Sequence, residues 1–177
     1  MIKRLYTGWA WHRLRRLLPG ERSGTAPVVL WILEEEQFSV FRPLLDELGR
    51  SWGADRQRWI LFSDRETPTP EPSFAHYVLG VRERRRWNGI HPRLRSWIEA
   101  ERPRWALSLK RPTVPESAEI LLCSGALWRI TLDEPPLEGI ADVVWALPEG
   151  DPEYMVTRMA CYAEWLSGFR LPVGWAT

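Results

Sequence analysis

Six short apolar runs alternate along the chain with segments of helical periodicity. They lie at 27–33, 58–63, 76–80, 104–109, 127–132 and 142–147. The first, Pro27–Leu33 (PVVLWIL), contains no polar residue. Continuous apolar strands are typical of parallel sheets whose two faces are both covered by helices. We therefore expect a three-layer, Rossmann-like α/β fold with a mostly parallel sheet of about six strands.

Helical patterns fill most of the intervals between these runs. We expect helices from about Glu36 to Arg50, from Pro92 past Ile98, from Pro115 to Ser124 and from Asp151 to Gly168. The second and third runs have no helical segment between them, and neither do the fifth and sixth. We interpret each of these two places as an edge of the sheet or a crossover.

The beginning of the chain is expected to form an appended element. Residues 3–18 look helical, and 1–22 hold six basic residues against one acidic residue. Arg13 and Arg16 interrupt the apolar stripe of this helix, so the pattern differs from that of a membrane-surface helix. We divide the chain into a basic N-terminal helix and link at 1–22, the Rossmann-like domain at 23–170 and a tail at 171–177.

Composition narrows the class of protein. The 177 residues carry a formal net charge of +1 and include two cysteines. Those cysteines have no CxxC or histidine context, so we expect free thiols in a reducing, cytoplasmic compartment and no metal. No apolar run approaches the ~20 residues of a membrane span, and no cofactor is expected.

The residues after the first apolar run differ from those of a dinucleotide-binding protein. Such a protein places glycines there, before a helix whose bare N–H groups hold a phosphate. This chain has Glu34, Glu35 and Glu36 instead. The three carboxylates use the positive end of the helix themselves and repel a phosphate. We therefore expect no dinucleotide site of the usual kind.

Polar residues at the strand ends offer one candidate site, because ligands of such sheets lie beyond the carboxyl ends of the strands. Glu35 and Asp64 come close if the first two strands are neighbours, and carboxylates suit a divalent cation. A phosphate would instead use the residues after the fourth strand, namely Lys110, Arg111 and Thr113. The alternative is that all of these are ordinary helix-start and loop residues. Ser63 is interpreted as a turn residue.

The basic stretch 82–104 is the stronger candidate, with eight arginines against three glutamates. It includes the consecutive residues Arg84, Arg85, Arg86, Trp87 and Asn88. Arginines beside an exposed aromatic residue neutralise phosphates and stack bases, which suits RNA. The same side chains suit an acidic protein surface. The alternative is a solvated arginine-rich face.

We therefore predict a non-catalytic binding or assembly protein that contacts an anionic partner, protein or RNA, through Arg84–Asn88 together with Arg13 and Arg16. DNA is not expected, and a homo-oligomer through exposed tryptophans is an alternative. The runner-up is a small-ligand enzyme or sensor that uses the strand ends, for a phosphorylated or metal-bound ligand.

Several short motifs keep a characteristic order between about 27 and 168. These are WILEEEQFSVFRPLLDELG, the turn Arg86–Gly89, the strand RWALSL, the strand Asp142–Leu147 and the closing pair Trp165-Leu166. Their order resembles a bacterial family of small single-domain α/β proteins to which no function is assigned. The resemblance implies a Rossmann-like fold and no mechanism. This chain has Ser108 where that family carries a carboxylate in the fourth strand.

Overall fold

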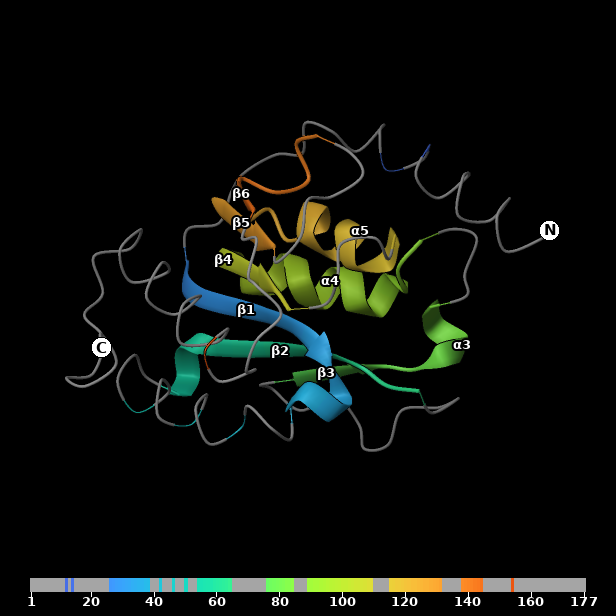
Figure 1. Ribbon diagram of the computed structural model, residues 1–177, viewed down its shortest axis with the longest axis horizontal. Helices are drawn as coiled ribbons and strands as arrows, with labels where there is room; N and C mark the ends of the chain where they lie inside the picture. Colours follow the sequence, from blue (N-terminus) through green and yellow to red (C-terminus); the bar gives the residue numbers. More distant parts are fainter. Residues whose placement is uncertain are drawn as a thin grey trace.

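A six-stranded sheet forms the centre of the protein, in the order β3-β2-β1-β4-β5-β6, and all of its pairings are parallel (Figure 1). The structure, a computed structural model, describes residues 26–38, 54–64, 76–84, 89–109, 115–131 and 138–144, with the single residues 12, 14, 42, 46, 50 and 154. The strand order is that of a Rossmann fold, which reverses direction between β1 and β4. The predicted α/β fold is confirmed.

The strands coincide with the predicted apolar runs. Their bounds are β1 Ala26–Glu34, β2 Gln57–Phe62, β3 His76–Leu79, β4 Pro103–Ser108, β5 Trp128–Thr131 and β6 Val143–Val144. β3 and β6 occupy the two edges of the sheet. Each of them comes after one of the two places that we interpreted as an edge of the sheet or a crossover, and the strand order puts an edge at both.

Two of the expected helices are described in full. α4 spans Pro92–Glu101 with Pro92 in its first turn, and α5 spans Pro115–Cys123. Residues 35–38, 42, 46 and 50 are also helical, as expected for the helix after β1. The short elements η1 (Ala54–Arg56) and α3 (Val81–Arg84) were not predicted.

The two predicted terminal helices lie almost entirely outside the described residues. Of the segment 3–18, only His12 and Leu14 are described, and both are helical. Leu14 is fully buried in the hydrophobic core. Of the segment 151–168, only Tyr154 is described, and it is helical and exposed. Within the described part of the chain, none of the helices has the length and apolar character needed to cross a membrane.

Helices cover both faces of the sheet. On one face, strand residues such as Ile32, Ile60 and Phe62 belong to one buried cluster with Leu94 of α4 and Leu121 of α5. On the other face, the helix that follows β1 sets the Phe38 ring edge-on to Trp59, with 5.7 Å between the ring centroids. Right-handed connections require this split, because the chain moves one way across the sheet from β1 and the opposite way from β4.

Candidate functional site

A polar cluster at the carboxyl edge of the sheet joins the ends of β1, β2 and β3. It consists of Glu35, Ser63, Asp64 and Arg84, and we call it the carboxyl-edge cluster. The Ser63 hydroxyl donates to Glu35 Oε2 over 2.5 Å. Arg84 Nη2 donates to the Ser63 carbonyl oxygen over 2.6 Å and to Asp64 Oδ1 over 3.1 Å. Four residues from three separate segments therefore form one hydrogen-bonded chain.

Local capping positions the two helical segments that contribute to this cluster. The Glu34 N–H donates to Gln37 Oε1 over 2.9 Å, and the Gly80 N–H donates to Glu83 Oε2 over 3.2 Å. Each bond is one half of a capping box, in which the side chain of the third helical residue accepts a hydrogen bond from the backbone N–H of the residue before the helix. Each helix thus begins directly after its strand. The helix start after β1 is bordered by glutamates, which disfavour a phosphate there.

The interpretation of Ser63 as an ordinary turn residue needs correction. Ser63 is fully buried and bridges β1 to α3 through its hydroxyl and its carbonyl. Its own N–H donates to the Leu79 carbonyl over 3.1 Å, which extends the pairing of β2 with β3. The expected proximity of Glu35 and Asp64 follows from the pairing of β1 with β2, since Glu35 contacts the residue that precedes Asp64.

Arg84 belongs to the carboxyl edge more than to an open basic surface. Its side chain is 17% exposed, and its guanidinium lies 5.8 Å from the centroid of the Phe62 ring. Asp64, its ionic partner, is largely exposed. The other predicted site residues lie outside the described residues; they are Arg85, Arg86, Trp87, Asn88, Arg13, Arg16, Lys110, Arg111 and Thr113.

The residues on both sides of the segment 85–88 are firmly held. Arg84 precedes it and is bound at the carboxyl edge. Ile90 follows it, is buried, and donates its N–H to Glu119 Oε2 over 3.1 Å. Glu119 is itself buried in α5 and accepts from Arg95 Nη2 over 3.4 Å. The segment therefore begins and ends at fixed points of the fold.

The arginines of the basic stretch separate toward opposite edges of the sheet. α4 starts beside the carboxyl edge and ends beside the amino edge (Figure 1). Arg84 precedes α4, whereas Arg102 and Arg104 follow it at the start of β4. Among the described arginines of the stretch 82–104, Arg84 thus lies at the carboxyl edge, and Arg102 and Arg104 lie at the amino edge.

The carboxyl-edge cluster offers hydrogen-bond donors and acceptors to a polar ligand. Across the residues that the structure describes, no three His, Cys, Asp or Glu side chains are placed to hold a metal ion. No family model, curated protein or solved structure matches the chain.

Proposed function

We propose that this protein is a binding or assembly protein that contacts an anionic partner, protein or RNA, through the segment 85–88 together with Arg13 and Arg16. One observation carries the proposal: the segment is short, rich in arginine, contains Trp87 and lies between two anchored residues. Fixed ends limit the conformational freedom that the segment loses on binding, which favours affinity.

Arg84 has a supporting role in this proposal. Its charge is shared with Asp64 and with the Ser63 carbonyl, so we assign the partner contact to Arg85 and Arg86 and the anchoring of the segment to Arg84. Trp87 between arginines and Asn88 suits a base or a planar group as well as an acidic protein surface. The partner is therefore defined by its negative charge.

The test compares the masses of two variants with that of the wild type. The full chain is isolated gently from its native cells and weighed by native mass spectrometry. We expect the wild type to carry a partner, and the variant with Arg85→Glu and Arg86→Glu to lose it through charge repulsion. The matched control replaces two arginines whose side chains are exposed, Arg42→Glu and Arg50→Glu, and is expected to keep the partner.

Three outcomes contradict the proposal. They are a bare monomer for the wild type, a mass that corresponds only to several copies of this chain, and a partner that the Arg85, Arg86 variant retains. In that variant Arg84 stays in place, so the carboxyl-edge cluster remains intact.

A second candidate function is the binding of a small polar ligand at the carboxyl-edge cluster, where Glu35, Ser63 and Arg84 converge. The test is a thermal-shift screen with divalent cations and nucleotides, in which this function predicts a saturable rise in melting temperature. A ligand that binds only the native state raises the free energy of unfolding by about 2.7 kcal/mol when its concentration is a hundred times its Kd. Ser63→Ala should remove the rise because it breaks the cluster. A wild type that shows no saturable rise contradicts this candidate.

A further inference from the structure

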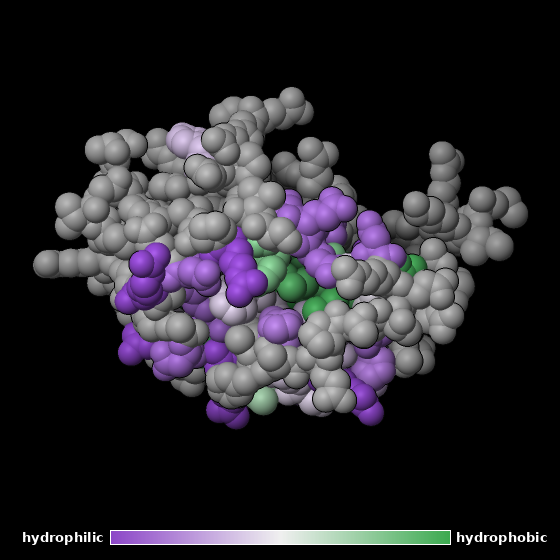
Figure 2. Space-filling view, turned by 90° about the horizontal axis from the view of Figure 1, so that it is seen from below, coloured by the Kyte–Doolittle hydropathy of each residue, from purple (hydrophilic) through white to green (hydrophobic). Residues whose placement is uncertain are grey.

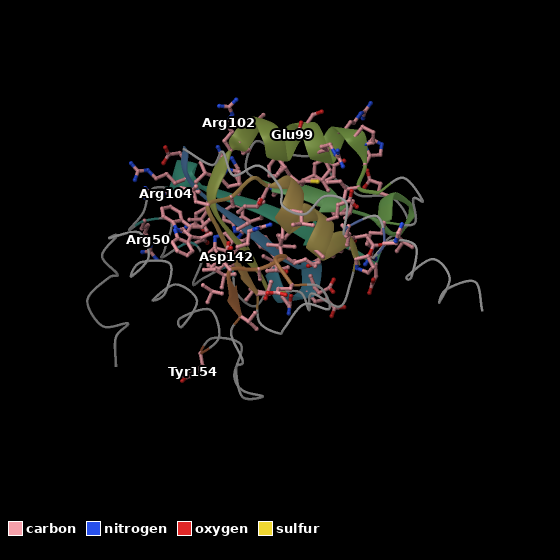
Figure 3. The ribbon with its side chains drawn as sticks, turned by 90° about the horizontal axis from the view of Figure 1, so that it is seen from above. Arg50, Glu99, Arg102, Arg104, Asp142 and Tyr154 are labelled. Atoms are coloured by element: carbon pink, nitrogen blue, oxygen red, sulfur yellow. The ribbon has the colours of Figure 1, made fainter. Side chains whose placement is uncertain are left out.

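Two arginines and an exposed tryptophan lie at the amino edge of the sheet, opposite the carboxyl-edge cluster. Arg102 ends α4 on one face of the sheet, and Trp128 belongs to the face that carries Trp105. β4 and β5 pair with Trp105 opposite Trp128, so the starts of the two strands lie side by side. Trp128 is 36% exposed, and Leu127 before it is exposed as well. In Figure 3, Arg102 and Arg104 extend away from the ribbon at this end of the molecule. We call Arg102, Arg104, Leu127 and Trp128 the amino-edge surface.

Arg104 carries a charge that no carboxylate in the described part of the chain neutralises. Its guanidinium lies 5.0 Å from the centroid of the Trp105 ring, a cation–π contact that holds the side chain in place. Its Nε is buried and finds no acceptor among the described residues. Because this Nε is buried, an external anion can be bound only by the two terminal nitrogens of the guanidinium, whose planar donors match a phosphate.

Arg102 occupies a backbone position that favours glycine. It is the C-cap of α4, with φ 44° and ψ 54°, and its N–H donates to the Ile98 carbonyl over 3.3 Å. A side chain with a Cβ is strained in this left-handed conformation, which glycine adopts freely. The backbone therefore gives no reason for arginine here, and the exposed side chain adds a positive charge close to the start of β4.

The acidic residues near this edge are partly neutralised by the fold. Glu101 accepts a bond from Arg58 Nε over 2.8 Å, so its charge is already paired. Asp142 accepts from the Arg129 N–H over 2.8 Å and faces the Arg129 guanidinium at 3.7 Å. Glu99 is exposed on α4, and Figure 3 shows it on the same helix as Arg102, close to its end. Seen from below, Figure 2 shows hydrophilic side chains toward the end of the molecule where β2 begins.

We infer that the amino-edge surface binds single-stranded RNA, with Arg102 and Arg104 on phosphates and Trp128 stacked on a base. The exposed tryptophan favours RNA over an acidic protein surface, because unpaired bases stack on aromatic side chains. The inference rests on the proposed function, from which it takes the negative charge of the partner. It adds a binding surface at the opposite edge of the sheet and names RNA as the partner.

The test measures binding of a fluorescently labelled oligouridylate to the full chain by anisotropy at several salt concentrations. Arg102→Glu combined with Arg104→Glu should reduce the magnitude of the slope of log K against log salt by about 1.4, which is about 0.7 for each phosphate contact to a single strand. Trp128→Ala should weaken binding roughly ten-fold through lost stacking. The control Arg42→Glu reverses the charge of an exposed arginine outside both the amino-edge surface and the basic stretch, and it should leave affinity and slope close to wild type.

Arg102→Gly separates binding from folding. It removes the charge while relieving the left-handed strain, so we expect a higher melting temperature together with weaker RNA binding. The inference fails if the wild type shows no saturable binding of the oligouridylate, or if the Arg102, Arg104 variant binds as the wild type does. If that variant binds normally and Arg85→Glu with Arg86→Glu abolishes RNA binding, the proposed function stands and the amino-edge inference alone fails.

Discussion

Replacing Trp31 by alanine is expected to lower the free energy of unfolding by about 3–5 kcal/mol, measured by urea denaturation of the full chain. Trp31 is fully buried in β1, where it stands between Trp59 of β2 and Leu107 of β4. Alanine removes the whole indole from the middle of the sheet, and the flanking strands cannot close the cavity without breaking their pairing. The loss is large against the stability of about 5–15 kcal/mol that domains have.

Two further variants define the cause of this effect. The Trp31 Nε1 has no acceptor among the described residues, so Trp31→Phe loses ring volume but no hydrogen bond and should lower the free energy of unfolding by only about 1–2 kcal/mol. Trp128→Ala removes a tryptophan from the same face of the sheet at an exposed position and should lower it by less than about 1 kcal/mol. Equal losses for Trp31→Ala and Trp128→Ala would contradict cavity formation as the cause.

The sequence predicts the strands well because burial on both faces removes polar residues from them. The run 27–33 corresponds to β1 at Ala26–Glu34, and the run 104–109 to β4 at Pro103–Ser108. The same apolar pattern contains no information on which strands are neighbours. The observed order follows from right-handed connections and from the face on which each helix packs, and neither is readable from periodicity.

The carboxyl-edge cluster was predictable only in part. Glu35 and Asp64 were found because each follows the end of an apolar run, and such ends gather at one edge of a parallel sheet. Ser63 was missed because a serine at a strand end has no distinctive pattern, and its role depends on the pairing of β1 with β2. Arg84 was assigned to an open surface because the sequence does not show that α3 ends there and directs it toward β2.

The division of the basic stretch has a geometric cause. α4 contains ten residues, and a helix of that length rises about 15 Å, enough to carry the chain from one edge of the sheet to the other. Arginines close in sequence on either side of α4 are therefore far apart in space. A linear count of charge over 82–104 detects the arginines but combines two surfaces into one.

Replacing Glu101 by alanine is expected to lower the free energy of unfolding by about 3 kcal/mol, because it removes the carboxylate that the buried Arg58 Nε contacts. The side chains of the pair are 5% and 15% exposed, and Arg58 Nε lies 2.8 Å from Glu101 Oε2. Arg58 Nη1 keeps its hydrogen bonds to the Asp55 and Gln57 carbonyl oxygens. These carbonyls accept from the guanidinium but carry no negative charge to neutralise it. Chemical denaturation of the full chain measures the loss.

The chain provides a matched control in Arg42 and Asp46, whose side chains are 69% and 60% exposed and 3.9 Å apart. Asp46→Ala should change the free energy of unfolding by less than about 0.5 kcal/mol, because water screens this pair. The double variant Arg58→Met with Glu101→Leu should recover most of the loss of Glu101→Ala, since it removes the buried guanidinium as well. A double variant as unstable as Glu101→Ala would show that packing of the side chains, and not the charge of the buried guanidinium, accounts for the loss.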